Sequence, residues 1–263
     1  MQSPNEFVVR SAIRRAIVMR LSEGPASTDD LLSDTNASTS AIYDALSSLR
    51  RRGLLSEGDD TWGLTAYGQL VADAIDRWQS TETFLERDPE YWKHHDATVI
   101  PSKFRRRLPE IGEYEVIRSD RSQVTRHHRA VVSRLQGADH CLVLAPFFSV
   151  EYQAAVPNSP ETRMLIHPSA VDTRAQRIRE GLDEGEYLNR TEQRLTECEF
   201  GFTVGDGFLV FSLPTRSDDP TTATVVSETD AAVEWARELF EEKWDASESI
   251  ERYAAREHPD IWG

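Results

Sequence analysis

The stretch from Ser38 to Leu55, STSAIYDALSSLRRRGLL, constrains the fold of this chain more than any other. Ser38 stands where a helix N-cap is expected, and Gly53 stands where a chain leaves a helix through a left-handed residue. Between them, apolar side chains recur at helical spacing, at Ile42, Ala45, Leu46 and Leu49. The pattern predicts a short amphipathic helix with one buried face and a small, polar, exposed front.

The segments before this helix predict two more. Apolar side chains in residues 5–21 share one helical stripe, with arginines mostly opposite, so a first helix is expected there. Gly24 and Pro25 end it. A second short helix is predicted over TDDLLSD, residues 28–34, because Asp29 and Asp30 would occupy the favourable first turn.

The segments after it predict a hairpin and a long helix. Residues 54–65, LLSEGDDTWGLT, have turn residues between two short apolar stretches, as in a small hairpin. Thr65 then caps a long helix over AYGQLVADAIDRWQSTETFLE. The residues of that helix at core spacing are Leu70, Ala74, Ile75 and Trp78. Three helices, a hairpin and a following helix form the winged helix-turn-helix plan.

The charge of the chain bears on what such a unit can bind. Its 263 residues carry a net charge of −15, and only three of the basic residues are lysines. A dispersed acidic surface with scarce lysine is typical of proteins in concentrated salt, which screens that surface from DNA. We therefore expect a protein from a concentrated-salt habitat. The alternative is that the acidity argues against nucleic acid altogether.

The remainder of the chain alternates strand and helix patterns. Three prolines punctuate residues 86–112, which predicts a helical linker or adapter. HCLVLAPF, residues 140–147, is a continuous apolar run, as expected of a strand covered on both faces. A long helix is expected over residues 229–253. We expect an α+β winged helix-turn-helix domain over residues 1–85, joined by the adapter to a C-terminal α/β sensor and dimerisation domain over residues 113–263.

Particular residues resemble known families. TSAIYDALSSLRRRGLL followed by WGLTAYG resembles the recognition helix and wing exit of TrmB-type and MarR-type winged helix regulators. YWKHHDATVIPSKFRRRLPEIGEYEVI, GDGFLVFSLP and WARELFEEKW resemble the middle sensor domain of regulators similar to the methanogenesis regulator. The resemblance implies a homodimeric transcription regulator that binds double-stranded promoter DNA. One departure is the acidic wing, which carries Glu57, Asp59 and Asp60 where many wings carry a basic residue.

The predicted DNA contacts follow from the helix pattern. The helix front would lie in the major groove, and the phosphates would be held by arginines near its end and on the first helix. The expected DNA-binding residues are Ser38, Thr39, Ser40, Tyr43, Asp44, Ser47, Arg14, Arg15, Arg51 and Arg52. The alternative interpretation makes this stretch one helix of an α-helical core with a charged tail.

A small-molecule effector, of unknown identity, is expected beyond the carboxyl ends of the parallel strands, where α/β sheets bind ligands. The candidate residues there are Phe147, Phe148, Tyr152, His167 and Ser169. Arg126 is a further candidate, because basic residues outnumber acidic ones between Lys103 and Arg134. That basic segment has three open uses: binding an anionic effector, contacting DNA, or pairing with acidic residues across an interface.

Motifs for catalysis and cofactors are missing from the sequence. It has no G-x-S-x-G, no Gly-rich phosphate loop with lysine and no H-E-x-x-H. None of the lysines follows a histidine by two positions, as phospholipase D chemistry would require. We therefore expect no enzyme and no cofactor, in a cytoplasmic protein without a secretory signal or an apolar run of about 18 residues.

Two other functions stay open on sequence grounds. The winged helix can serve as a protein-interaction module, with the acidic surface recruiting a basic partner. A metal-responsive repressor is the second, because His94-His95 and His127-His128 form two pairs. Adjacent histidines on one helix point about 100° apart, however, and do not naturally share a metal.

Overall fold

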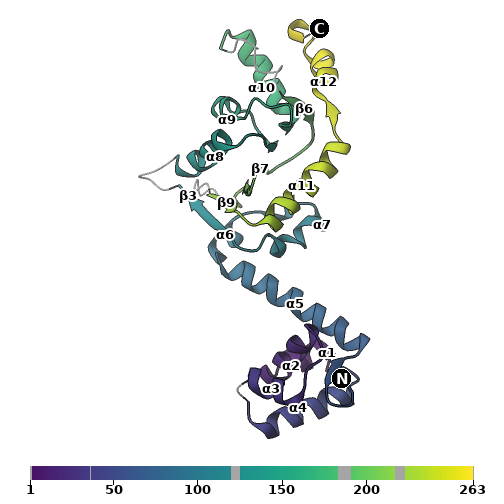
Figure 1. Ribbon diagram of the computed structural model, residues 1–263. Coiled ribbons are helices and arrows are strands. Elements are labelled where there is room, and N and C mark those ends of the chain that lie inside the picture. Colours follow the sequence, from purple (N-terminus) through teal and green to yellow (C-terminus); the bar gives the residue numbers. More distant parts are fainter. Residues whose placement is uncertain (1, 36, 120–124, 183–190, 217–222, 263) are drawn as a thin grey trace. The chain divides into compact units, whose positions relative to one another are not determined.

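The computed structural model describes residues 2–35, 37–119, 125–182, 191–216 and 223–262, and Figure 1 traces them along the chain. The chain divides into two compact units, Met1–Thr83 and Phe84–Gly263. Each unit is described by itself below.

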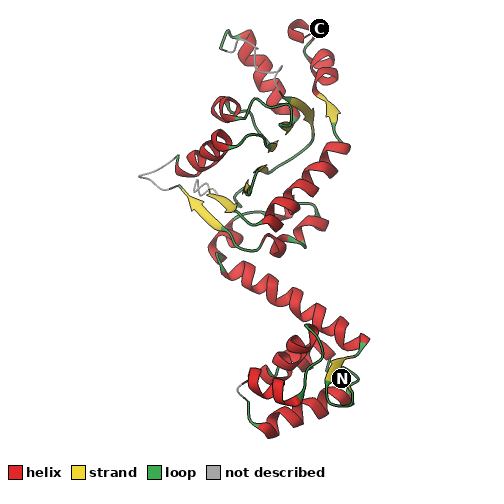
Figure 2. Ribbon diagram, in the orientation of Figure 1, coloured by secondary structure: helices red, strands yellow, loops and turns green. Residues whose placement is uncertain are grey.

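The first unit has the winged helix-turn-helix arrangement, with helices around a small hairpin (Figure 2). Its elements are α1 (Pro4–Val9), α2 (Ala12–Ser22), α3 (Thr28–Thr35), α4 (Thr39–Arg51), β1 (Leu55–Glu57), β2 (Trp62–Leu64) and α5 (Ala66–Glu86). The fold class predicted for this part of the chain is confirmed.

The predicted first helix is divided into α1 and α2. Ser11 has extended backbone, and its hydroxyl accepts a hydrogen bond from the Arg14 amide at 3.3 Å, as a helix N-cap does. The apolar stripe continues across this break because Phe7, Ile17 and Leu21 enter the same core. Periodicity therefore predicted the buried face correctly and missed the interruption.

Helix α5 departs from its predicted packing. Ile75 is buried as expected, but Leu70 is 68% exposed and Trp78 is 44% exposed. The two exposed side chains share a stripe of the helix with Tyr67 and Leu85, which are also exposed. Their helical spacing is real, yet within the first unit this stripe does not face the core.

The chain turns tightly where α4, the hairpin and α5 meet. Gly53 has a φ of +73°, so the predicted left-handed exit from α4 is present. The Thr65 hydroxyl donates to the Gly53 carbonyl at 2.6 Å and accepts from the Gly68 amide at 2.9 Å. A Cβ at Gly68 would lie 2.0 Å from the Leu54 carbonyl oxygen. Only glycine allows the backbones to approach this closely.

We expect Gly68→Ala to lower the free energy of unfolding of the first unit by roughly 1–3 kcal/mol, because the new methyl group overlaps backbone that cannot move aside. Urea unfolding of the full chain, monitored by circular dichroism, measures this change in the free energy of unfolding. Gly63→Ala is the matched control, since its nearest neighbour, the Ser56 hydroxyl, would lie 4.0 Å from the added Cβ. Equal unfolding midpoints for both variants would contradict the close approach.

The second unit is a mixed sheet with helices on both faces. Its strands are β3 (Glu115–Arg118), β4 (Leu142–Ala145), β5 (Arg163–Ile166), β6 (Glu192–Leu195), β7 (Gly201–Gly205), β8 (Phe208–Ser212), β9 (Ala223–Ser227) and β10 (Glu248–Ser249). Its helices are α6 (Pro89–His94), η1 (Ala97–Val99), α7 (Ser102–Arg105), η2 (Leu108–Ile111), α8 (Arg126–Gly137), α9 (Val150–Ala155), α10 (Pro168–Arg179), α11 (Asp230–Asp245), α12 (Ile250–Glu257) and α13 (Pro259–Trp262).

The strand order across this sheet is β10-β6-β5-β4-β7-β8-β9-β3. Strands β4, β5 and β6 run parallel, and the remaining neighbours pair antiparallel. The α/β class predicted for this part of the chain is confirmed. Two strands were not predicted: β6, whose EQRL sequence has no apolar run, and the short β10, which interrupts the long helix expected over residues 229–253.

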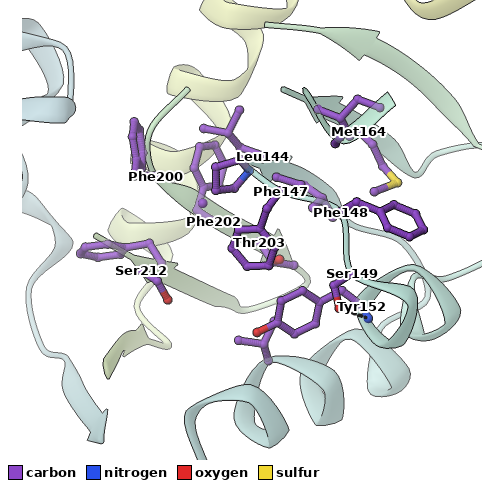
Figure 3. Close-up of a pocket in the computed structure, with 18 of the residues that line it drawn as sticks. Leu144, Phe147, Phe148, Ser149, Tyr152, Met164, Phe200, Phe202, Thr203 and Ser212 are labelled. Atoms are coloured by element: carbon purple, nitrogen blue, oxygen red, sulfur yellow. Dashed lines mark hydrogen bonds between the residues drawn. The ribbon is translucent and has the colours of Figure 1, made fainter. Parts of the chain in front are cut away.

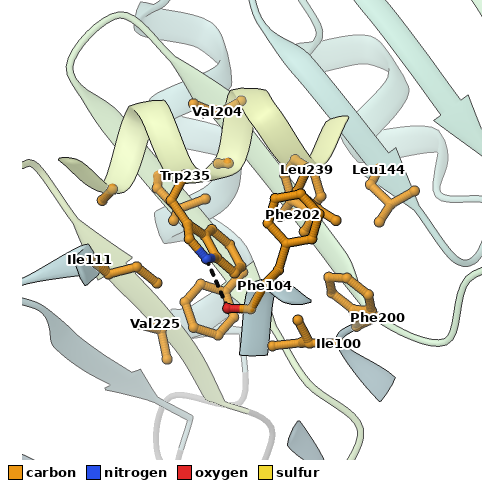
Figure 4. Close-up of a cluster of buried hydrophobic side chains, with 14 of the residues drawn as sticks. Ile100, Phe104, Ile111, Leu144, Phe200, Phe202, Val204, Val225, Trp235 and Leu239 are labelled. Atoms are coloured by element: carbon orange, nitrogen blue, oxygen red, sulfur yellow. Dashed lines mark hydrogen bonds between the residues drawn. The ribbon is translucent and has the colours of Figure 1, made fainter. Parts of the chain in front are cut away.

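One face of the sheet is closed by α11 and by the segment preceding β3 (Figure 4). The Trp235 indole donates a hydrogen bond of 3.1 Å to the Phe104 carbonyl, and the two rings meet edge to face. Phe104, Ile100 and Ile111 are fully buried. Residues 86–112, predicted as an adapter, therefore pack into the core of the second unit.

Part of the predicted basic segment forms ion pairs. Lys103 contacts Glu242 at 2.6 Å, and Arg107 contacts Glu110 at 2.8 Å and Glu238. In addition, Arg118 holds Asp88 through two hydrogen bonds of 2.6 and 2.7 Å. Of the three uses considered from sequence, pairing within the unit accounts for these side chains. Arg121, which belongs to the same basic segment, lies outside the described residues.

Candidate functional site

Helix α4 begins at a capped and exposed end. Ser38 has extended backbone, and its hydroxyl accepts a hydrogen bond from the Ala41 amide at 3.4 Å. The Ser40 hydroxyl lies 3.3 Å from that of Ser38. Two small hydroxyl side chains therefore stand at the positive end of the helix dipole, where phosphate oxygens are favoured.

The front of α4 is exposed as the sequence pattern predicted. Tyr43 is 55% exposed and is the largest side chain on this front. The buried face carries Ile42, Ala45, Leu46 and Leu49, as expected. The polar front consists of Thr39, Ser40, Tyr43, Asp44 and Ser47, all exposed. A helix front of this size and polarity fits the width of a DNA major groove.

The arginines around α4 occupy three different settings. Arg50 forms an ion pair with Glu57 of the hairpin. Arg14 and Arg52 both stack on the Phe7 ring, with guanidinium carbons 3.9 and 3.8 Å from its centre. Burial and the neighbouring Arg52 charge lower the pKa of Arg14.

The remaining arginines and the wing complete the surface. Arg51 is exposed, and Arg15 on α2 is half-buried. The wing turn is closed by a hydrogen bond of 2.7 Å from the Gly58 amide to the Thr61 carbonyl. Asp59 and Asp60 in that turn are exposed, so the wing presents negative charge.

We expect Ser38→Ala to destabilise the first unit by about 0.5–1 kcal/mol, because it leaves the Ala41 amide without its cap. Ser47→Ala, an exposed change in the middle of the same helix, should be neutral or slightly stabilising because alanine has the higher helix propensity. Urea unfolding of both variants measures the difference. A Ser38→Ala variant as stable as Ser47→Ala would show that the cap contributes nothing.

The second unit contains a cavity of about 520 Å³ between the sheet and the helices α8, α9 and α10. Figure 3 shows side chains from several strands and from the segment after β4 turned toward it. Phe147, Phe148 and Tyr152 line it, as their position after a parallel strand suggested.

The other candidate effector residues lie apart from the cavity lining. His167 contacts the Ser169 hydroxyl at 2.7 Å and the Glu197 carboxylate at 2.7 Å. This trio caps and anchors the start of α10 rather than facing the cavity. Arg126 is exposed in the first turn of α8.

One row of side chains crosses the sheet beneath the cavity. The strand register places Gln193, Met164, Val143, Thr203 and Val210 side by side from β6 to β8. All five line the cavity, and sequence analysis identified none of them. Their common feature is register across five strands, which periodicity within one strand cannot supply.

Two cavity residues have environments set by burial. Arg174 on α10 is 3% exposed and brings a permanent positive charge into the wall. The Tyr152 ring stacks on His128 with ring centres 4.3 Å apart, and burial raises the pKa of its phenol to about 12. The phenol is therefore protonated, and can donate a hydrogen bond, at any physiological pH.

The histidine pairs do not converge. His95 is buried, stacks on Tyr91 and lies 2.9 Å from the Tyr91 carbonyl, whereas His94 contacts the Glu90 carbonyl at 2.8 Å. His127 contacts Ser119, and His128 contacts Glu151 at 3.1 Å. Over the described ranges, no three His, Cys, Asp or Glu side chains gather in a way that could hold a metal ion.

In the same ranges, no helix has the length and apolar character needed to cross a membrane.

Two family models match stretches of this chain. Residues 3–85 match the HVO_A0261 N-terminal domain, and residues 124–246 match the middle domain of the methanogenesis regulatory protein FilR1. The resemblance to the methanogenesis-regulator middle domain is confirmed, and the winged helix unit is similar to the HVO_A0261 N-terminal domain.

Three of the solved structures that are similar to this chain cover different shares of it. TrmBL2, described as an archaeal chromatin protein with a novel mode of DNA binding, is 17% identical over 90% of this chain and 93% of that chain, with a TM-score of 0.40. A ZitR mutant from Lactococcus lactis is 24% identical over 29% of this chain and 58% of its own, with a TM-score of 0.26. NucT from Helicobacter pylori is 8% identical over 52% of this chain and 100% of its own, with a TM-score of 0.39. Among curated proteins, none matches this chain.

Proposed function

We propose that this chain is a DNA-binding transcription regulator whose C-terminal α/β domain senses a small molecule. The observation that carries the proposal is the exposed front of α4, presented beside a hairpin wing within a domain similar to the HVO_A0261 N-terminal domain. The match of residues 124–246 to a domain of a regulatory protein supports it. The proposed protein acts in the cytoplasm as a homodimer.

In this proposal α4 enters the major groove of each half-site. Thr39, Ser40, Tyr43 and Asp44 face the base edges, and Ser47 follows one turn later. Ser38 and the backbone amide groups at the start of α4 contact one phosphate of the DNA backbone. Arg51, together with Arg14, Arg15 and Arg52, contacts further phosphates. Arg50 is less available because Glu57 of the wing already neutralises it.

The acidic wing restricts which residues can contribute phosphate contacts to the affinity for DNA. With Asp59 and Asp60 exposed, the wing repels the DNA backbone at low salt and is screened at high salt. The arginines around α4 must then supply most of the phosphate contacts. Few such contacts give a shallow dependence of affinity on salt, which suits a protein for concentrated salt.

The test of the DNA role compares Tyr43→Ala and Arg51→Ala on fragments selected from genomic DNA by the unaltered protein. We expect Tyr43→Ala to weaken binding to the selected fragment at least five-fold and to reduce preference over random DNA, because a base contact is lost. Arg51→Ala should weaken both kinds of DNA about equally. Gel-shift titration at several salt concentrations measures both effects.

The matched control is Arg252→Ala, which removes an exposed arginine of the second unit outside the basic segment. It should leave binding unchanged. If Tyr43→Ala and Arg51→Ala, both folded, bind every fragment as the unaltered protein does, α4 has no DNA role. Absence of discrete intergenic sites in chromatin immunoprecipitation would favour the rival proposal, a protein-interaction module recruited through the acidic wing.

The proposed dimer is supported by the exposed apolar stripe on α5. Tyr67, Leu70, Trp78 and Leu85 are large, exposed and confined to an arc of about 80° at 100° per residue. A stripe of this size on one helix is typical of an association surface. A second copy of the chain would cover it and set the spacing of the two α4 helices, roughly 34 Å for half-sites one helical turn apart.

We expect Leu70→Glu combined with Trp78→Glu to convert the dimer to monomer, because charges would be buried at the contact. Sedimentation velocity at several protein concentrations measures the mass. Asp76→Lys changes charge on the opposite side of α5 and should leave the dimer intact. A monomeric unaltered protein, or a double variant that is still dimeric, would remove α5 from the proposed interface.

A further inference from the structure

The chemistry of the cavity in the second unit narrows the class of molecule that it can bind. This inference rests on the proposed ligand-sensing role of that unit. Apolar and aromatic side chains form most of the wall, among them Val143, Met164, Phe202 and Val210 on the sheet side. A ligand with many hydroxyl groups would leave those hydroxyls without partners against such a wall, at a cost for each.

Thr203 is a polar residue in the middle of the cavity floor; the other buried polar residues of the wall are Gln193, at the β6 end of the same row, and Arg174 on α10. It is 5% exposed and lies between Val143 and Val210 in the strand register. Its hydroxyl makes no hydrogen bond to another described residue, although Figure 3 shows its side chain turned to the cavity. Other buried threonines of this sheet are satisfied: Thr162 accepts from the Cys141 amide, and Thr224 contacts Ser212.

The Thr203 hydroxyl faces the cavity, so its capacity to donate and accept hydrogen bonds is available to whatever occupies that space. A ligand oxygen entering the cavity would supply a hydrogen-bond partner, because Thr203 lines the space directly.

The far wall favours a flat molecule. The Tyr152 ring, held by stacking on His128, lies 6.2 Å from the Phe147 ring, measured between ring centres. Both rings line the cavity, and Figure 3 places them across from the strand that carries Thr203. Aromatic walls of this kind bind planar apolar groups through offset stacking and edge contacts.

We propose that the cavity binds an aromatic or similarly flat apolar molecule that carries one hydrogen-bonding oxygen, and that Thr203 bonds this oxygen. The apolar body lies against the valines, Met164 and the Tyr152 and Phe147 rings. Thr203 then determines specificity. The volume, about 520 Å³, is within the range of small-molecule sites.

The test measures binding to the full chain without DNA. The neutral fluorescent probe N-phenyl-1-naphthylamine is titrated to saturation and then displaced with 4-ethylphenol, ethylbenzene or glucose. We expect 4-ethylphenol to displace the probe about five-fold better than ethylbenzene, the difference of one hydrogen bond, and glucose to have no effect. In Thr203→Val this preference should fall to about one or reverse, while ethylbenzene still binds.

Thr162→Val is the matched control, since Thr162 is buried in the same unit but does not line the cavity. It should keep the five-fold preference. Because the preference is a ratio within one variant, a partly unfolded sample does not imitate its loss. No saturable probe binding, displacement by glucose, or an unchanged preference in Thr203→Val would each overturn the inference.

The result of this ligand-binding test can be distinguished from a test of the proposed DNA function. If the chain binds 4-ethylphenol through Thr203 but does not bind DNA, the ligand inference is supported and the regulator proposal is wrong. A chain that binds DNA through α4 without Thr203-dependent binding in the cavity would give the reverse result.

Discussion

The hydrogen bond from the Trp235 indole to the Phe104 carbonyl connects the two segments that close one face of the larger sheet. It joins α11 to a segment about 130 residues earlier in the chain and seals that face with interlocking aromatic rings. The opposite face is covered by three shorter helices, which do not fill the space above the strands. The cavity wall is nevertheless continuous with this core, because Leu144 and Phe200 line the cavity and belong to the same buried cluster as Trp235.

Much of the first unit was predictable because its signals are local. The Ser38 cap, the Gly53 exit and the polar hairpin turn depend on residues within a few positions of one another. Two predictions were wrong for a shared reason. Helical periodicity continued across the break at Ser11, and it placed Leu70 and Trp78 in the core. Periodicity reports which side chains share a face, but neither where a helix is interrupted nor what that face contacts.

In the second unit, sequence reasoning found the alternation of strands and helices and the segment after β4 that lines the cavity. It missed β6, because the EQRL sequence lacks an apolar run although Gln193 is buried. It also missed Thr203, whose surroundings come from Val143 on one neighbouring strand and Val210 on the other. Such a residue is conspicuous only after the register is known, since GFTVG by itself is an ordinary strand.

The Phe7 ring between Arg14 and Arg52 has a consequence for the free protein. Each guanidinium is attracted to the ring, yet the two like charges repel, and this repulsion contributes to the lowered pKa of Arg14. The folded domain therefore carries an electrostatic tension that an anion near both groups would relieve. A polyanion that did so would stabilise the native state by an amount that rises with the logarithm of its concentration above the dissociation constant, and protein turnover would then depend on how much polyanion is present.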